Sequence, residues 1–244
     1  MGGLYFDNSV RLEPSQVAGF NQAYRSLIPE SVSGANAGAT FTTYGVSLEQ
    51  RFPTRTYVAV GAQLLHSVAG HDVGVWQREL LTGEGFGIQA QEKLRYQERS
   101  LDASIHQLLA DWFTVGVRYR LSEARLRREF PEVDPGIVGA NNHQSQGVLH
   151  TLSLQQLFRH SSGFFAGGEA VWWSQQLSGN LRSLPEDEFW QGNLFVGYRS
   201  PRRYVEITIG ILNITDEDYR IHPVNLYAEL PRERTIFARV RLNF

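Results

Sequence analysis

Charged residues alternate with apolar residues in several segments of the chain, and this spacing limits the chemistry they can do. In "FTVGVRYRL", residues 113–121, Arg118 and Arg120 fall on the side opposite Val117 and Tyr119. Successive side chains of a β-strand point to opposite faces, so both arginines would share one face of a strand. This placement favours ion pairing with a neighbouring strand over catalysis.

The same spacing recurs in other segments, with charges of both signs. Asp102, Glu169 and Glu206 lie on the polar sides of their segments, and "TIFARVRLNF", residues 235–244, adds Arg239 and Arg241. A buried charge without a partner is costly, so residues that line an interior are expected to pair. We predict a chiefly structural ion-pair network, with a substrate path along it as the alternative. Its members are Asp102 with Arg118 and Arg120, Glu206 with Arg239 and Arg241, and Glu169.

Other titratable residues that could do chemistry lie in segments predicted to be loops. They are His71 with Asp72, His143, and Glu186 with Asp187. No nucleophile motif, paired-histidine metal spacing or phosphate-binding glycine loop accompanies them. We therefore expect no enzyme activity, no cofactor and no metal site, and an outer-membrane hydrolase is the least favoured reading.

Composition excludes several classes of protein. The 244 residues contain no cysteine, so disulfide frameworks and thiolate metal sites are absent. The 23 basic and 25 acidic residues nearly balance, which gives no general attraction to nucleic acid. The longest apolar runs are far shorter than the roughly 18 residues of a membrane-spanning helix, so any crossing of a membrane would use strands.

Period-two alternation dominates the chain and predicts an all-β fold. Nine strands are expected from about residue 40 onward, and a weaker one at 3–12 would make ten. Tight links around Pro53–Arg55, Leu109–Asp111, His160–Ser162 and Ser200–Arg202 alternate with long polar segments. We predict those segments, 66–92, 128–146, 176–187 and 213–232, to be extracellular loops, because up-and-down transmembrane barrels have short periplasmic turns and long outer loops.

One segment departs from the alternation. Between Pro14 and Pro29, apolar residues recur at three- and four-residue steps, which predicts a short helix at 14–28 inside a loop at 13–39. The apolar positions are Val17, Phe20, Tyr24 and Leu27.

The alternation also fits a soluble β-sandwich or ligand-binding barrel, whose apolar face points inward. Two features favour a lipid-facing wall instead. Lys93 is the only lysine, so the polar face lacks the composition of a solvated surface. Aromatic residues also gather toward strand ends, as in the aromatic girdles of membrane barrels; they are Tyr44, Trp112, Phe113, Trp172, Trp190, Tyr198 and Phe244.

The last 35 or so residues contain Asn213, Asp216 and Tyr219, then Pro231 and Arg232, and end on an alternating strand that closes with Phe244. This combination resembles the C-terminus of TonB-dependent outer-membrane receptors. That family carries an Asn-Leu-Thr/Phe-Asp-x-x-Tyr segment after the penultimate strand, then Pro-Arg, then an alternating last strand that ends in Phe. The corresponding residues here are Asn213, Ile214, Thr215, Asp216, Tyr219, Pro231, Arg232, Arg234 and Phe244. The resemblance implies an integral protein of a Gram-negative outer membrane, whose C-terminal strand, with Val240, Leu242 and Phe244, is recognised by the outer-membrane assembly machinery.

The expected architecture is a transmembrane antiparallel up-and-down β-barrel of about ten strands. It would be a single barrel over residues 1–244, or the C-terminal part of a larger barrel, because family receptors have about 22 strands and a plug. The expected function is transport or receptor activity. The alternative is a small closed barrel that anchors periplasmic domains or other subunits in the lipid bilayer.

Overall fold

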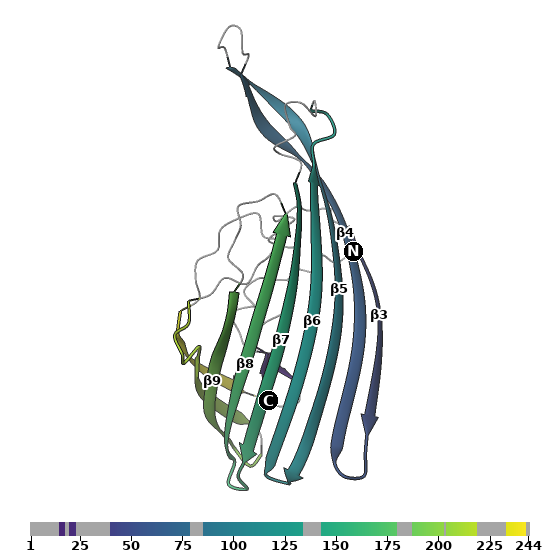
Figure 1. The fold of residues 1–244 in the computed structure, drawn as a ribbon. Coiled ribbons are helices and arrows are strands. Elements are labelled where there is room, and N and C mark those ends of the chain that lie inside the picture. The colour runs from purple at the N-terminus through teal and green to yellow at the C-terminus, as the bar shows by residue number, and fades with distance from the viewer. Residues whose placement is uncertain are drawn as a thin grey trace.

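The chain folds into one large antiparallel sheet and a separate two-stranded ribbon in the computed structural model (Figure 1). The structure describes residues 15–17, 20–22, 40–78, 85–133, 143–179, 187–202, 204–218 and 233–242. Nine strands pair in sequence order, from β3 to β11, so each strand neighbours the next one along the chain. Their bounds are β3 (Thr40–Arg51), β4 (Thr56–Arg78), β5 (Gly85–Ala110), β6 (Phe113–Glu129), β7 (His143–Arg159), β8 (Phe164–Gly179), β9 (Asp187–Arg199), β10 (Val205–Leu212) and β11 (Thr235–Leu242).

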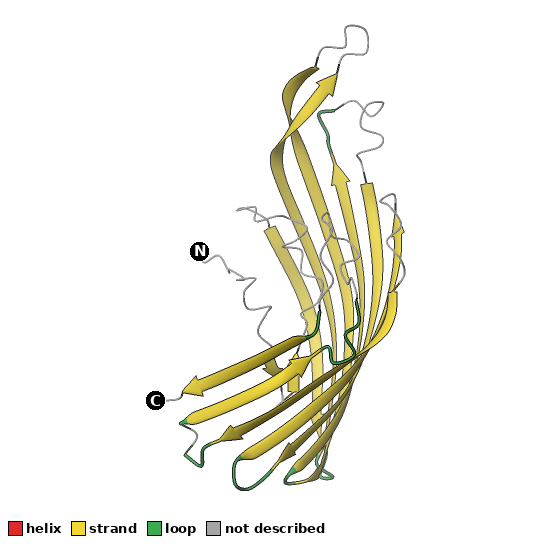
Figure 2. Cartoon of the chain, turned by 90° about the vertical axis from the view of Figure 1, so that its left-hand side faces the viewer, coloured by secondary structure: helices red, strands yellow, loops and turns green. Residues whose placement is uncertain are grey.

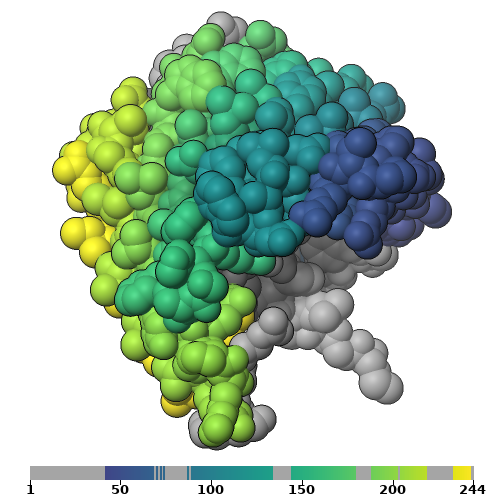
Figure 3. Space-filling view, turned by 90° about the horizontal axis from the view of Figure 1, so that it is seen from below, coloured from purple at the N-terminus to yellow at the C-terminus, as the bar shows by residue number. Residues whose placement is uncertain are grey.

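The all-β, up-and-down prediction is therefore confirmed, including nine strands from residue 40 onward. The sheet is not closed, since β3 and β11 form its two edges and no pairing joins them in the described residues. Viewed from below, these two ends of the sheet lie on opposite sides of the molecule (Figure 3). The expected strand at 3–12 lies outside the described residues.

The helix predicted at 14–28 is wrong where the structure describes it. Ser15–Val17 (β1) and Phe20–Gln22 (β2) pair as a short antiparallel ribbon, with Val17 opposite Phe20. Apolar residues three apart, which suggested a helical face, are here cross-strand neighbours. Nowhere in the described ranges is there a helix, and so none long and apolar enough to cross a membrane.

The strands differ greatly in length. β4 and β5 have 23 and 26 residues and pair along the whole of β4, whereas β10 and β11 have 8 each. At about 3.3 Å per residue, β5 is roughly 85 Å long. Figure 2 shows the sheet curving and the β4–β5 ribbon rising beyond the other strands. The expected loop at 66–92 is thus largely strand, with only 79–84 outside the described residues.

The two faces of the lower sheet differ in polarity. We call the face that carries Val117, Leu154 and Ile209 the outer face, and the face that carries Asp102, Glu169 and Glu206 the inner face. On the outer face a continuous band of large apolar side chains is exposed, and we call it the apolar band. Its exposed members include Tyr44, Val46, Leu48, Val60, Leu101, Ile105, Val117, Leu154, Trp190, Leu194, Val196, Ile207, Ile209, Ile236, Val240 and Leu242.

Beyond the band, on β5 and β6, the polarity of the two faces is exchanged. On β6 the outer face changes from Val117, Tyr119 and Leu121 to Glu123, Arg125 and further charged residues. The inner face changes from arginines to buried apolar residues. These belong to the upper core, a cluster of Leu94, Tyr96, Ala124, Leu126, Leu149, Val171, Trp173 and Phe189.

Phenylalanine rings near the short turns explain two inner-face glycines. Phe195 lies directly over Gly167, and Phe165 lies over Gly197. A Cβ at either glycine would collide with the ring, so only glycine permits this close approach. The rings pack with Leu157 and Phe237 into a small apolar cluster at the lower end of the inner face.

Candidate functional site: the polar inner face

The polar residues of the inner face are positioned by direct pairing of neighbouring strands. Asp102 of β5 lies opposite Arg120 of β6 and next to Arg118. Arg118 Nε donates to Asp102 Oδ2 at 2.7 Å, so this expected pair is present. Arg120 Nε lies 3.4 Å from Ser122 Oγ on its own strand.

Glu206 is a carboxylate on the inner face. Its main partner, Arg199, was not predicted from the sequence. The Glu206 side chain is 4% exposed and accepts from Arg199 Nε at 2.6 Å. Arg239 is farther away, at 3.8 Å. Arg241 lies opposite Glu206 in the strand register but is exposed and forms no ion pair in the described part of the chain. The expected pair between Glu206 and Arg241 is therefore not formed.

Arg199 and Arg241 both lie directly opposite Glu206 in the strand register, but only Arg199 reaches its carboxylate. Glu206 lies opposite Arg199 in the β9–β10 hairpin, and Arg199 also stacks over the Phe165 ring at 5.8 Å. In the sequence, Arg199 falls on the polar side of the alternating segment "FWQGNLFVGYR", residues 189–199. Only the side-chain contact shows that Arg199, rather than Arg241 of the last strand, neutralises Glu206.

Glu169 is held by amides instead of arginines. Gln155 Nε2 donates to one carboxylate oxygen at 2.8 Å and Asn193 Nδ2 to the other at 3.1 Å. These residues come from the strands on either side of β8. Sequence reasoning missed both amides, although each lies on the polar side of a predicted strand.

The Asn213 to Asp216 segment continues this network beyond the strands. The Asn213 backbone N–H donates to Asn193 Oδ1 at 3.0 Å, and Asn213 Oδ1 accepts from the Glu217 backbone N–H at 3.1 Å. Asn213 and Asp216 both have positive φ values, 52° and 57°, a conformation that asparagine and aspartate tolerate better than most residues.

Asp216 ties this turn to the beginning of the last strand. Its Oδ1 accepts from the Arg234 backbone N–H at 3.1 Å, and its Oδ2 lies 3.4 Å from the Arg234 guanidinium. Asn213 and Asp216, which both match the receptor-like motif, thus bond the segment that follows β10 to β9 and to the beginning of β11. Tyr219, Pro231, Arg232 and Phe244 lie outside the described residues. Val240 and Leu242 are exposed on the outer face, 62% and 55%.

Beyond the apolar band, Tyr96 and Glu98 form a buried polar pair beside the upper core. The Tyr96 hydroxyl donates to Glu98 Oε2 at 2.8 Å. Burial raises the pKa of the Glu98 carboxyl, and the hydrogen bond from Tyr96 and the charge of Arg120 oppose that rise. Burial and the nearby Glu98 charge raise the pKa of the Tyr96 hydroxyl. At neutral pH Tyr96 is therefore a hydrogen-bond donor.

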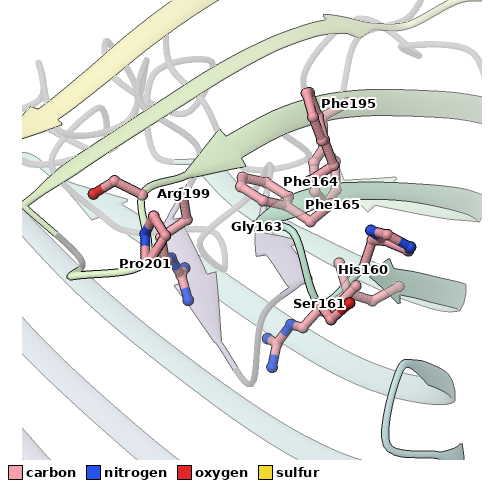
Figure 4. Close-up of a pocket in the computed structure, with 11 residues that line it drawn as sticks. His160, Ser161, Gly163, Phe164, Phe165, Phe195, Arg199 and Pro201 are labelled. Atoms are coloured by element: carbon pink, nitrogen blue, oxygen red, sulfur yellow. The ribbon is translucent and has the colours of Figure 1, made fainter.

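A cavity of about 250 Å³ opens at the lower end of the inner face (Figure 4). It lies between the short turns that follow β7 and β9 and combines phenylalanine rings with basic side chains. One of these, Arg199, already binds Glu206, so the cavity is partly neutralised. Its lining includes Leu157, Arg159, His160, Phe165, Phe195 and Arg199.

The described side chains include no group of three histidines or carboxylates that could hold a metal ion. His71 and Asp72 lie on β4, where a loop was expected, and His143 and Asp187 begin β7 and β9. Glu186 lies outside the described residues. The inner face is therefore a set of paired charges and amides.

Comparison of the chain with models of protein families, with curated proteins and with solved structures found no match. The fold and the inner face alone define its class: an all-β, antiparallel, up-and-down sheet of nine strands.

Proposed function

We propose that the chain spans a bacterial outer membrane as the wall of a transmembrane β-barrel and takes part in transport or in receptor function. One observation carries the proposal: large apolar side chains are exposed on the outer face, while polar and charged side chains are buried on the inner face. Ile236 is 76% exposed and Val46 73%, whereas Glu206 is 4% and Thr208 1% exposed. Soluble proteins rarely expose a contiguous apolar surface of this kind.

The dimensions of the apolar band agree with a bilayer. On β6 the apolar outer side chains run from Phe113 to Leu121, close to the ~9–11 residues with which a tilted strand crosses the hydrocarbon. Glu123 and Arg125 follow immediately on the same face. The transition from apolar to charged residues is as abrupt as the boundary between hydrocarbon and headgroups.

Aromatic residues mark both margins of the band. Trp112, Phe158 and Phe164 cluster around the short turns, where Trp112 packs edge-on against Phe158 at 5.6 Å. At the other margin Trp172 Nε1 donates to Glu188 Oε1 at 3.1 Å, and Tyr119 bonds His150 at 2.7 Å. Rings with a polar tip suit the boundary between lipid and water.

The receptor-like role is supported by two features. The Asn213–Asp216 turn resembles the closing segment of TonB-dependent receptors, and β4 and β5 continue far beyond the apolar band, as strands must do to build a large external surface. Short turns at the opposite end then face the periplasm.

Anchoring is the second candidate, and the packed inner face favours it. Asp102, Glu206 and Glu169 are each bonded to neighbouring strands, so these charges stabilise the wall itself and are not free to line a channel. Conductance of the inserted protein in planar bilayers separates the two roles. Ion or solute flux supports transport, and a closed, stable insertion without any ligand response supports anchoring.

Refolding from urea tests the membrane proposal itself. We expect the chain to gain β-structure and protease resistance only with detergent or neutral phosphatidylcholine vesicles, and to migrate on gels with a different mobility before and after heating. A monodisperse, folded chain in buffer without any amphiphile would contradict the proposal.

A further inference from the structure

A group of cations lies on the outer face directly beyond the apolar band. Lys93, Arg95 and Arg99 alternate on β5, and Arg125 and Arg127 alternate on β6, so all five side chains share one face. We call them the basic patch. The only acidic residues interspersed with them on this face of the two strands are Glu123 and Glu129.

Those two carboxylates are already occupied. Glu123 Oε1 lies 2.5 Å from Arg125, and Glu129 Oε1 lies 2.6 Å from Arg127. Arg95 reaches Glu129 only at 3.9 Å. Lys93 and Arg99 take part in no ion pair with any described residue. The patch therefore keeps an excess of about three positive charges.

The strand register adds a repulsive pair. Arg95 of β5 lies directly opposite Arg127 of β6, and their side chains are 51% and 61% exposed. Like charges directly opposite one another destabilise a sheet, so a bound anion would relieve this repulsion. Exposed guanidinium groups also recognise phosphate through paired hydrogen bonds.

The position of the patch identifies the source of the anion. Arg99 lies two residues beyond the apolar Leu101, about 7 Å along the strand, and Arg125 follows Leu121 by four residues. Arg99 therefore lies at the level of lipid headgroups, whereas Arg95 and Arg127, six residues beyond Leu101 and Leu121, lie about 20 Å along their strands, at the level of phosphates carried farther out by a large glycolipid headgroup. The patch is at the end opposite the short turns, which corresponds to the outer leaflet if the short turns face the periplasm.

We propose that the basic patch binds the phosphate groups of a phosphorylated glycolipid of the outer leaflet. The proposal rests on the membrane-spanning role proposed above. Acyl chains of the lipid lie against the apolar band, and Arg95, Arg99 and Arg127 hold its phosphates. Lys93 and Arg125 surround these contacts with positive charge.

The test uses the full chain inserted into neutral phosphatidylcholine vesicles that contain a small fraction of diphosphorylated lipid A. Binding is measured by lipid retention in native mass spectrometry and by titration at two salt concentrations. The test variant is Arg95→Gln with Arg99→Gln. The matched control, Arg51→Gln with Arg202→Gln, removes two exposed arginines near the short turns.

We expect the wild type and the control to bind lipid A alike, with affinity that falls as salt rises. The test variant should bind roughly thirtyfold more weakly, about fivefold for each cation removed near the membrane surface. Lipid A without phosphates should not bind preferentially. Equal losses in both variants, equal binding of dephosphorylated lipid A, or equal retention of phosphatidylglycerol would overturn the proposal.

Insertion is scored separately, by the heat-dependent gel shift. A chain that inserts into neutral vesicles without preferring lipid A refutes the basic patch as a glycolipid site and leaves the membrane role intact. A chain that does not insert at all refutes both.

Discussion

The two halves of β6 have opposite polarity on the same two faces. From Phe113 to Leu121 the outer side chains are apolar and the inner ones include Arg118 and Arg120; from Glu123 to Glu129 the outer side chains are charged and the inner ones are Ala124, Leu126 and Arg128. The second half is arranged like a strand of a water-soluble sheet, and the first half is its inverse. Under the membrane-spanning role proposed above, one continuous strand passes between two surroundings, and burial of apolar surface drives its folding only in the second half.

The largest difference between the halves should appear on truncating a leucine. Leu126 is 2% exposed in the upper core, so Leu126→Ala leaves a cavity and should lower the free energy of unfolding in detergent by about 2–5 kcal/mol. Leu101 is 44% exposed on the apolar band, where detergent can fill the space. Leu101→Ala should cost less than about 1 kcal/mol. If urea titrations gave the same loss of unfolding free energy for both variants, the proposed difference between the upper core and the apolar band would be contradicted.

An added charge should have the opposite pattern and destabilise the apolar band more than the region beyond it. Val117 lies in the middle of the apolar band, and Val117→Arg should destabilise the vesicle-inserted protein by about 2–4 kcal/mol. Gln97→Arg, on the same face beyond the band, places a second arginine opposite Arg125 and should cost about 1 kcal/mol or less. The comparison is made by reversible unfolding from vesicles, and a cost at Gln97 as large as that at Val117 would contradict it.

Ion pairs on the inner and outer faces should contribute differently to the free energy of unfolding. The Asp102–Arg118 pair is about one-third exposed, and Asp102→Asn leaves Arg118 with a weaker partner, at a cost of about 1 kcal/mol. Glu123→Gln breaks the more exposed pair with Arg125 and should cost less than about 0.5 kcal/mol. Chemical unfolding at low and high salt would detect both effects, and equal salt sensitivity would show that the inner pair is as hydrated as the outer one.

The smallest effect concerns the pH dependence of the upper region. The pKa of Glu98 is raised in the folded chain above its ordinary value of 4.5, so folding favours the protonated carboxyl. Its contribution to stability is present below pH 4.5 and is lost as the pH rises through the folded pKa. Glu98→Gln keeps an acceptor for Tyr96 and should flatten stability over that range. Unfolding midpoints between pH 4 and 8 would check this, and an unchanged slope would show that Glu98 does not cause it.

Sequence patterns predicted the lower sheet better than the upper region for a physical reason. Where apolar side chains keep to one face, as in Phe113–Leu121, simple alternation identifies both the strand and its faces. On β5 the apolar positions change from the odd residues Leu101 and Ile105 to the even residues Leu94 and Tyr96. The alternation loses its phase there, and part of a long strand was predicted to be a loop.

Alternation likewise predicted only some of the side-chain partners on the inner face. Alternation was enough to place Asp102 beside Arg118, because their strands are consecutive. It could not select Arg199 over Arg241 for Glu206, since both arginines lie directly opposite Glu206 on strands next to β10 and only the side-chain contact separates them. The amides around Glu169 were missed because neutral residues were not considered as partners for a carboxylate.

Spin-label accessibility along β6 tests the central claim most directly, and the absence of native cysteine makes single-site labelling straightforward. Labels would be placed at the outer positions 115, 117, 119, 121, 123, 125, 127 and 129 of the vesicle-inserted chain. We predict that positions 115–121 are relaxed mainly by oxygen, which concentrates in lipid, and positions 123–129 mainly by a water-soluble nickel complex, with an abrupt change between 121 and 123. Preferential exposure to the nickel complex at all eight positions would contradict the account.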